Sequence, residues 1–371
     1  MRVAHVSTVH RALDVRIFRK ECRTLARAGH EVHLIVASCP AGPVDQVTFH
    51  ALETAPNAGR AKRIFVRQRS ALRLCRKLRA DLYHLHDPEL IPLGILLKLR
   101  GARVVYDVHE DTPREAWTLH REHPVRARLL SLAWLILEGV AKRVLDGFVC
   151  ATPTIAANFP PERTIIAHNY PLKEEFEGRM RKRDHGSPLR LVYAGVISVV
   201  RGVREMVVAV GLLPDALGAR LVLLGDFPSA ELEAEVKALP GWRRVLYLGW
   251  QPRERMLAEL AQSHVGLVLF HPEADHLDAL PNKLFEYMAA GLAVVASDFP
   301  LWRSLLERTG AGITVNPLDP PAIAKRIAEL YEEQDAVDRM GARGQSAISS
   351  DLNWEQEGRR LVALYARLSP G

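Results

Sequence analysis

The segment PNKLFEYMAAG, residues 281–291, places polar and charged side chains at the head of a predicted helix that leads directly into the buried strand LAVVASD. Pro281 suits the first helical turn, and Gly291 ends the helix before the strand. Asn282 and Lys283 then lie at the helix N-terminus, where unpaired N–H groups and the helix dipole favour an anion. This spacing therefore predicts a binding site for an anion such as phosphate.

Glu286 follows about one turn later, on a different face of the helix from Leu284 and Met288, which can pack inward. Because like charges repel, this carboxylate is unsuited to a phosphate, whereas both hydroxyls of a ribose can donate to it. Phosphate and ribose together predict a nucleotide. The alternative is a surface helix with a favourable acid in its first turns, which would leave the amide and the lysine without a function. Asp278 lies in the loop before the helix, within reach of another part of the same ligand.

A second candidate phosphate site follows the predicted strand LRLVYAG, residues 189–195. Gly195 ends this strand, and Arg201 and Gly202 lead into a helix. Free N–H groups at a helix start and a fixed cation beside them suit a phosphate. Because most β-α turns resemble this one, the signal is weak when taken alone.

In the first half of the chain, the strand DLYHLH ends in HDPEL. Asp87 is predicted to cap a helix that continues with a proline and an acid in its first turn. His84 and His86 fall on one face of the strand, and ordinary core histidines are the alternative to ligand contacts. The structural role of Asp87 is sufficient to explain it.

The next strand ends in HEDTPRE, where Thr112 and Glu115 have the spacing of a capping box. Because these two residues account for the helix start, His109, Glu110 and Asp111 remain clustered at the carboxyl end of the strand. Ligands of doubly wound sheets bind at that edge, so we expect His109 to face a ligand.

Short apolar runs alternate with segments of helical period along most of the chain, which is typical of parallel sheets covered by helices. The first unit is VAHVST, DVRIFRKECRTLARAG and HEVHLIVAS, with Asp14 as the helix cap and Gly29 as its stop. Further strands are predicted at residues 81–86, 102–108, 146–152, 189–195, 219–226, 243–250, 264–270, 292–298 and 312–317. The polar segment 173–188 is the predicted linker. We expect an α/β protein with two doubly wound, Rossmann-like domains, residues 1–172 and 189–355.

The formal net charge of +7 and the pI near 9.3 indicate anionic partners. Residues 60–79 contain nine Arg or Lys and no acid, with apolar residues at approximately helical spacing. This segment predicts a helix that contacts anionic lipid or an acidic acceptor, and a solvated helix face is the alternative. No nucleic-acid-binding motif accompanies the charge, so we expect no nucleic-acid partner.

The cysteines and the apolar segments bear on the compartment. Four cysteines lie far apart without a CxxC or Cys/His cluster, which argues against a zinc site or disulfides and favours a reducing cytosol. The start MRVAHVST lacks the features of a signal peptide, so we expect a cytoplasmic protein. The longest apolar stretch, LLSLAWLILEGVA from Leu129, is too short to span a bilayer and is predicted to be a buried helix.

With these segments in hand, the chain resembles a family 4 glycosyltransferase of the GT-B fold over nearly its whole length. The resemblance rests on HRALDVRIFRKE, HLHDPELIPLG, VVYDVHEDTPRE, HNYPL and above all LPNKLFEYMAAGLAVVASD. The C-terminal NWEQEGRRLVALYARL is similar to the last helices of the family. It implies that a helix of about residues 356–371 crosses back onto the first domain.

The resemblance implies a retaining transfer of a sugar from a nucleotide diphosphate donor to an acceptor. It implies that the second domain holds most of the donor, that the first domain holds the acceptor, and that the two sheets face a central cleft. Glu286 would bind the ribose diol, and Asp278 would hold hydroxyls of the transferred sugar. Arg201 matches the family lysine on the diphosphate, whereas Val196 stands at the position of the family arginine. His109 matches the family histidine that touches the transferred sugar.

The expected site residues fall into three groups. Catalytic roles are expected for His109, Asp278 and Arg201; donor binding for Glu286, Lys283, Asn282, Gly195 and Pro281; and acceptor contacts for His10, Asp14, Asp87 and Glu110. Lys283 is expected to replace the missing cation. No DxD motif occurs in the chain, so no metal or cofactor is expected.

The resemblance points to the synthesis of cell-surface polysaccharide, glycolipid or glycoconjugate, with peripheral attachment to the inner face of the membrane through residues 60–79. An inactive partner that binds a nucleotide sugar and assists another transferase is the alternative, motivated by Asp278 and Val196. A dinucleotide oxidoreductase is disfavoured because no GxGxxG follows the first strand. A retaining glycosidase would need a pair of acids independent of the nucleotide site.

Overall fold

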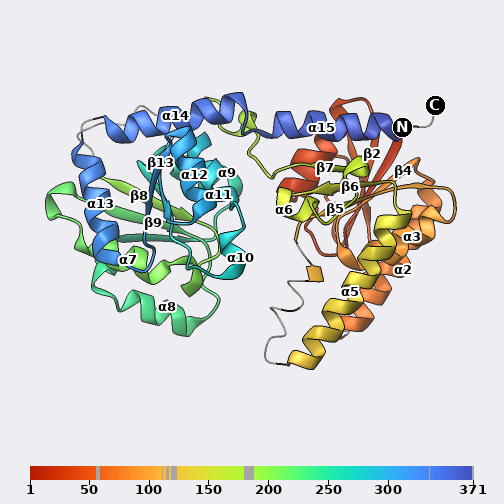
Figure 1. Ribbon diagram of the computed structural model, residues 1–371, viewed down its shortest axis with the longest axis horizontal. Coiled ribbons are helices and arrows are strands. Elements are labelled where there is room, and N and C mark those ends of the chain that lie inside the picture. Colours follow the sequence, from red (N-terminus) through yellow and green to blue (C-terminus); the bar gives the residue numbers. More distant parts are fainter. Residues whose placement is uncertain are drawn as a thin grey trace. The chain divides into compact units, whose positions relative to one another are not determined.

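The computed structural model describes residues 1–55, 59–110, 112–113, 117, 123–178, 188–333 and 335–369 (Figure 1). The chain divides into two compact units, of which unit 1 comprises Met1–Asn169 and Trp354–Gly371, and unit 2 comprises Tyr170–Asn353. The predicted linker begins with the short helix η4 (Lys173–Glu175). Its residues 179–187 lie outside the described part of the chain.

Unit 1 is built on a seven-stranded parallel sheet in the order β3-β2-β1-β4-β5-β6-β7. The strands are β1 (Arg2–Val6), β2 (Glu31–Val36), β3 (Val47–Ala51), β4 (Leu82–Leu85), β5 (Arg103–Val108), β6 (Gly147–Cys150) and β7 (Thr164–Ile166). The sequence analysis did not predict the two edge strands, β3 and β7. Only one of their residues, Val47, is fully buried, so these edge strands lack the buried apolar run by which the inner strands are recognised.

Helices cover both faces of the unit 1 sheet (Figure 1). On one face, Tyr83 of β4 shares a core with Ala71 of α2 (Arg60–Leu78), Leu93 of α3 (Ile91–Lys98) and Ala141 of α5 (Pro124–Val144). Successive strand residues point to opposite faces, so His84 lies on the other one. There, His84 Nδ1 is 2.8 Å from the hydroxyl of Tyr365, in α15 (Trp354–Arg367). The helical segment η1 (Val15–Cys22), which is wound as a π-helix, and α1 (Arg23–Arg27) pack beside α15.

Helix α5 differs from the prediction, because the apolar segment from Leu129 does not form a buried helix. Its exposed large apolar side chains are 39% to 72% accessible and comprise Val125, Leu129, Leu132, Leu135, Ile136 and Val140. Ala127, Glu138 and Ala141 are the buried ones. A helix that is apolar all round reads as buried from sequence, whereas α5 packs along only one of its faces. No helix in the described residues is long and apolar enough to cross a bilayer.

Unit 2 is built on a six-stranded parallel sheet in the order β10-β9-β8-β11-β12-β13. The strands are β8 (Arg190–Ala194), β9 (Arg220–Leu224), β10 (Val245–Gly249), β11 (Val265–Val268), β12 (Ala293–Ser297) and β13 (Gly312–Val315). The longer helices are α7 (Val203–Leu212), α8 (Ala230–Lys237), α9 (Arg253–Ala261), α11 (Asn282–Ala289), α12 (Pro300–Thr309), α13 (Pro320–Glu332) and α14 (Ala336–Ser350). The strands β11 and β12 are buried along their whole length, as expected for strands covered on both faces.

Each sheet contains a point at which the strand order reverses. In unit 2, β8 and β11 are hydrogen-bonded neighbours although β9 and β10 lie between them in sequence. In unit 1, β1 and β4 are related in the same way. The carboxyl ends of such strands form the crevice in which doubly wound folds bind their ligands. These two edges therefore position the candidate site residues.

Candidate functional site

At the carboxyl edge of unit 2, the side chain of Lys283 reaches the turn that follows β8. Gly195, in this turn, has a φ of +135°, and a Cβ at this position would lie 2.7 Å from Lys283 Cε and even closer to Nζ. A side chain at residue 195 would therefore displace the lysine. The glycine that the sequence analysis singled out for phosphate contact also provides the space for Lys283.

Two cations share the aromatic surroundings of this edge. Lys283 Nζ lies 5.3 Å from the ring centroid of Tyr193 and 5.7 Å from that of Phe270. Arg201 Cζ lies 5.5 Å from the same Phe270 ring. Burial, followed by the charge of Arg201, lowers the pKa of Lys283 to about 8, and Glu286 opposes this shift. Two positive charges held together in this way suit an anion that binds both.

Glu286 is fixed by a residue that the sequence analysis missed. Nη1 of Arg253, at the start of α9, donates to Glu286 Oε1, and Nη2 donates to Glu175 Oε2 at 2.7 Å. All three side chains are at most 17% exposed. Both carboxylates raise the pKa of Arg253 against the effect of its burial, so the guanidinium stays charged. Arg253 occupies one oxygen of Glu286 and thereby orients its carboxylate.

The start of α11 has no side-chain cap. Pro281 is the N-cap residue, and Asn282, the first residue of the helix, is exposed. Asp278 is exposed as well and lies just after the short helix α10 (Ala274–Leu277). The Trp302 indole N–H donates to the carbonyl of Ala279 at 2.6 Å and anchors the segment between α10 and α11. The N–H of Leu284 donates to the carbonyl of Pro281 at 3.1 Å, so the N–H groups of Asn282 and Lys283 are the ones that a ligand could use.

At the carboxyl edge of unit 1, Asp87 does not cap the helix that follows it, contrary to the prediction. Its side chain makes no capping hydrogen bond. Instead, Asp87 Oδ2 accepts from the backbone N–H and the hydroxyl of Thr8, at 2.5 and 3.1 Å. Asp87 thus ties the turn after β1 to the end of β4, across the point where the strand order reverses.

His10 lies between two acids at this edge. Its Nδ1 is 3.5 Å from Asp14 Oδ2, and its Nε2 is 3.5 Å from Asp87 Oδ1. Asp14 also caps η1, as predicted, by accepting from the N–H groups of Arg16 and Ile17. The hydrogen bond to Asp14 raises the pKa of His10. Burial would raise the pKa of Asp14, but His10 and the N–H groups outweigh it and lower that pKa to about 2.

His109 belongs to the same group of side chains. Its ring stacks on that of His10 with centroids 5.6 Å apart, and its Nε2 is 2.8 Å from Asp107 Oδ2. Arg16 donates to both oxygens of Asp107, at 3.0 and 2.7 Å, and His86 Nδ1 lies 3.1 Å from Oδ2. Although burial opposes them, Arg16 and then His109 hold the pKa of Asp107 well below its usual range. Asp107 is therefore a buried anion that orients His109.

The structure brings His10, Asp14, Asp87 and His109 together at one edge. Glu110 is exposed and lies directly after His109. From the sequence, Asp111 was expected in the same cluster and Glu115 at the start of the following helix. Both residues lie outside the described part of the chain.

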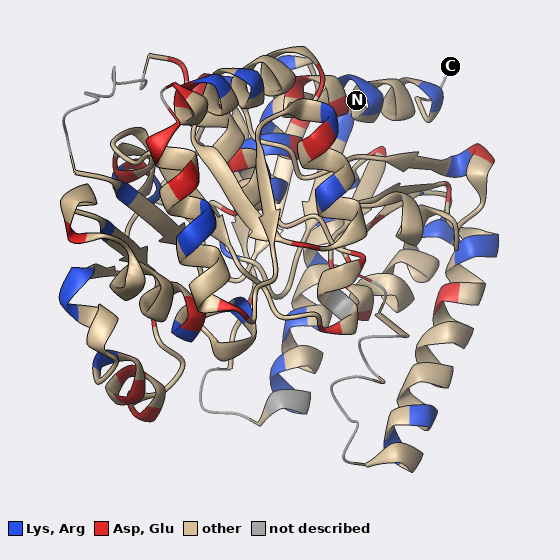
Figure 2. Cartoon of the chain, turned by 60° about the vertical axis from the view of Figure 1, so that its left-hand side comes forward, with Lys and Arg blue, Asp and Glu red and all other residues tan. Residues whose placement is uncertain are grey.

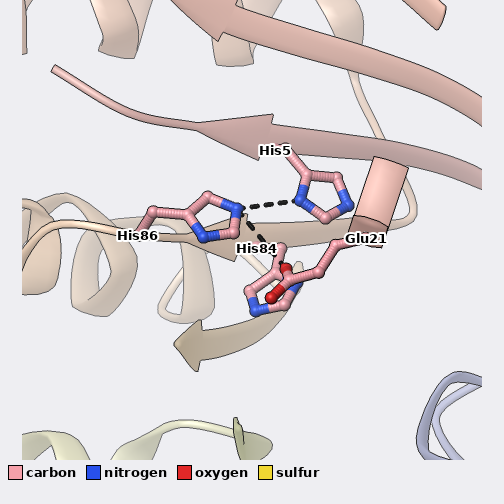
Figure 3. Close-up of side chains that lie close together, drawn as sticks. All are labelled: His5, Glu21, His84 and His86. Atoms are coloured by element: carbon pink, nitrogen blue, oxygen red, sulfur yellow. Dashed lines mark hydrogen bonds and ion pairs between the residues drawn. The ribbon is translucent and has the colours of Figure 1, made fainter. Parts of the chain in front are cut away.

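Behind this edge, His5, Glu21, His84 and His86 form a buried histidine cluster (Figure 3). One ligand-type atom from each lies within 4.8 Å of the others, and His5 Nδ1 is 2.8 Å from His86 Nε2. Imidazole and carboxylate donors at this spacing suit a zinc-like ion. However, Arg16 Nε lies 3.2 Å from Glu21 Oε1 and already supplies a positive charge there. Burial and Asp107 raise the pKa of Glu21 well above its usual range, and burial lowers the pKa values of His5 and His84, so burial favours the uncharged forms of these side chains.

Sequence reasoning missed Arg16, Asp107 and Arg253. Asp107 had a visible signal, since it is an acid within the apolar run VVYDV. Arg16 is unusual because a guanidinium that is only 4% exposed requires a buried partner. Arg253 had no local signal, because its two partners lie far from it along the chain.

Comparisons with known proteins agree with this arrangement. A model described as "Glycosyltransferase Family 4" matches residues 15–173, and one described as "Glycosyl transferases group 1" matches residues 188–333. The amylovoran biosynthesis glycosyltransferase AmsK of Erwinia amylovora is 22% identical over 218 residues, or 58% of this chain. That match spans 53% of AmsK, so it covers about half the length of this curated relative.

Solved structures share the whole fold. Sucrose-phosphate synthase of Thermosynechococcus elongatus has a TM-score of 0.76 and 17% identity, over 99% of both chains. Anabaena Alr3699/HepE in complex with UDP-glucose has a TM-score of 0.74 and 13% identity, over 99% of this chain and 100% of that one. The paired parallel sheets, the edge residues and the matches to both halves agree. This chain belongs to the family 4 glycosyltransferases and has the GT-B fold.

Proposed function

We propose that this glycosyltransferase moves a sugar from a nucleotide diphosphate donor to an acceptor with retention of configuration. The observation that carries the proposal is the group at the carboxyl edge of unit 2. There, Arg201 and Lys283 share the ring of Phe270, and Glu286, on the same helix as Lys283, is held by Arg253. The two cations suit the diphosphate, and the free oxygen of Glu286 suits the ribose diol. The complex of Alr3699/HepE with UDP-glucose supports this class of donor.

The chemistry requires stabilisation of the leaving group. Negative charge grows on the diphosphate as the bond to the sugar breaks, and Arg201, Lys283 and the start of α11 supply positive charge there. The departing phosphate takes the acceptor proton, so no dedicated base is needed. Asp278 holds hydroxyls of the transferred sugar in this proposal. His109, which Asp107 orients at the carboxyl edge of unit 1, keeps in this proposal the role at the transferred sugar that the family resemblance implies.

The acceptor is assigned to the edge of unit 1 that carries His10, Asp14, Asp87 and Glu110. Acids and a histidine with a raised pKa can accept and donate hydrogen bonds to the hydroxyls of a glycan. The match to an amylovoran biosynthesis enzyme supports a role in cell-surface polysaccharide or glycoconjugate synthesis. We place the reaction in the cytoplasm, with the basic residues of 60–79 directed to the inner face of the membrane.

The reaction is proposed to need no metal, because Arg201 and Lys283 replace the positive charge that a metal would bring to the diphosphate. We expect turnover to be unchanged by EDTA. A loss of activity that is restored by Mg²⁺ or Mn²⁺ would contradict this part of the proposal.

A screen of UDP-, GDP-, dTDP- and ADP-sugars for thermal stabilisation tests the donor site. One donor should raise the melting temperature, and the rise should vanish in Glu286→Ala. Glu332→Ala, an exposed acid at the end of α13, is the matched control and should keep the rise. If no nucleotide sugar stabilises the wild type, or if Glu286→Ala responds like the control, the assignment is wrong.

An inactive binding partner of another transferase is the second candidate. It is favoured by Val196, which is 58% exposed at the position where the family carries an arginine, so that one expected cation is missing. Release of free nucleoside diphosphate from the donor by the purified chain would exclude this candidate. Binding of the donor without release, even with membranes present, would support it.

A further inference from the structure

The exposed face of α5 carries a continuous apolar stripe. Val125, Leu129, Leu132, Ile136 and Val140 recur every three or four residues and are between 39% and 72% exposed. At 3.6 residues per turn they span an arc of about 80° along the whole helix. This stripe, defined by these five residues, lies opposite the buried side of the helix, which is marked by Ala127 and Ala141. Scattered apolar residues are ordinary on a protein surface, but an aligned stripe of this length indicates an interaction surface.

The charges around the stripe have a single sign. Arg126 and Arg128 are exposed and flank the stripe on its two sides. The one acid in α5, Glu138, is only 4% exposed and lies on the buried side. The surface that α5 presents to solvent is therefore apolar at its centre and cationic at its margins. This is the composition of a helix that lies in a bilayer interface, where long basic side chains reach the lipid headgroups.

Helix α2 adds a second basic surface on the same side of the unit 1 sheet. It packs on the same face of the unit 1 sheet as α5, since Ala71 and Ala141 belong to one core. Lys62, Arg63 and Arg69 are exposed on it, and so is Phe65, at 65%. No acid occurs in residues 60–79, and the two long helices of unit 1 show few acidic positions (Figure 2).

Helices α5 and α2 are also longer than the strands of the unit 1 sheet and extend beyond them. Helix α5 has 21 residues and is about 31 Å long, whereas the neighbouring strand β5, with six residues, is about 20 Å long. Because β6 begins just after α5 ends, the excess length lies at the carboxyl edge of the sheet. Helix α2, with 19 residues, is placed in the same way before β4 (Figure 1). The first turns of both helices therefore project on the side of His10 and Asp87.

We propose that the α5 stripe inserts into the interface of an anionic lipid bilayer, with the basic residues of α2 contacting the headgroups. A second copy of this chain fits the surface less well, because its α5 would bring the same basic margins, and the one acid of α5, Glu138, is buried and offers them no partner. The proposal deepens the membrane contact given under the proposed function, since it adds the apolar element to the basic segment. It also places the acceptor edge of unit 1 beside the bilayer.

Flotation with liposomes tests the proposal independently of donor binding. Wild-type protein should float with vesicles that contain phosphatidylglycerol, less with pure phosphatidylcholine, and less again at high salt. Leu132→Glu/Ile136→Glu should reduce the bound fraction about tenfold or more, because two charges replace the inserted apolar groups. Leu99→Glu is the matched control, since Leu99 is 76% exposed and follows α3, at the opposite edge of the same sheet. This variant should float like the wild type.

Two results would overturn the proposal. One is a wild-type protein that fails to float with anionic vesicles, which would assign the stripe to a protein partner. The other is a double variant that floats as well as the control while its circular dichroism and melting temperature match the wild type. The donor-induced rise in melting temperature should persist in the double variant, so failure of membrane docking is distinguishable from failure of the donor site.

Discussion

Replacement of Lys283 by methionine should make the protein more stable and less active at the same time. In the absence of donor, Lys283 has a pKa of about 8 instead of 10.5, because its ammonium is buried beside the charge of Arg201. A group whose protonated form is disfavoured in the folded state weakens the fold wherever it is protonated. The charged lysine therefore lowers the free energy of unfolding by its full amount below pH 8. This loss shrinks as the pH rises from 8 to 10.5 and vanishes above that range.

The size of the effect follows from this interval. Each pH unit corresponds to about 1.4 kcal/mol, so a pKa that falls from 10.5 to about 8 costs at most about 3 kcal/mol at pH 7. Methionine retains the apolar stem of lysine, the contact with Tyr193 and the space beneath Gly195, but carries no charge. For a unit of this size, Lys283→Met should raise the melting temperature without donor by up to about 6 to 12 °C.

The same substitution removes a cation from the diphosphate, and loss of one such charge costs about 10²-fold to 10³-fold in turnover. Differential scanning calorimetry without donor at pH 7 and at pH 10, together with release of nucleoside diphosphate, measures both effects. The gain in melting temperature should shrink at the higher pH. Lys283→Arg is the control that keeps the charge and should not stabilise the protein. A methionine variant that melts at or below the wild-type temperature at pH 7, or that retains turnover, would refute the reasoning.

Three further predictions concern residues that orient the sites. Arg253→Met should raise the KM for the donor about tenfold or more with a smaller effect on kcat, because Glu286 loses the partner that orients it. Equal effects on KM and kcat would indicate that the substitution disturbs the folded structure as a whole. Gly195→Ala should lower the affinity for the donor at least tenfold, because the added Cβ displaces Lys283 and the φ of +135° is strained for alanine. A titration followed by intrinsic fluorescence measures this affinity, and an unchanged value would contradict the contact between residue 195 and Lys283. Asp14→Asn should lower the free energy of unfolding by about 2 kcal/mol above pH 4, because the pKa of Asp14 in the folded protein, about 2, lies below its ordinary value of 3.8. The difference in unfolding free energy between the two proteins should disappear as the pH falls towards 2. A difference that does not change with pH would disprove the ionic contribution of Asp14.

The sequence was sufficient for the inner strands of the two parallel sheets, because these strands are short, mostly apolar runs between helical segments. It also singled out Lys283 and Gly195 as candidate site residues, but it did not predict that the side chain of Lys283 occupies the space beside Gly195. That contact depends on the adjacency of β8 and β11, which are far apart along the chain. The capping role assigned to Asp87 was wrong, since a local pattern cannot reveal the more distant Thr8, which binds its side chain.

Charged residues in buried positions were the least predictable part of the site. Asp107 and Arg16 form a pair across 91 positions of sequence, so neither has a local pattern that identifies its partner. The exposure of α5 was missed for a related reason. Apolar residues occur on all sides of this helix, and only its packing against α3 and the sheet decides which side is covered.

The chain leaves unit 1 at Asn169 and returns to it at Trp354, and this path sets an order on folding during synthesis. Unit 2 is continuous, so all of its residues have been synthesised before the helix that completes unit 1. Until then, Thr24 lacks the indole N–H of Trp354, and the buried His84 lacks the hydroxyl of Tyr365. A released chain that ends just before residue 354 would therefore hold every residue of the second unit, but its first unit would lack the helix that covers His84 of the buried histidine cluster.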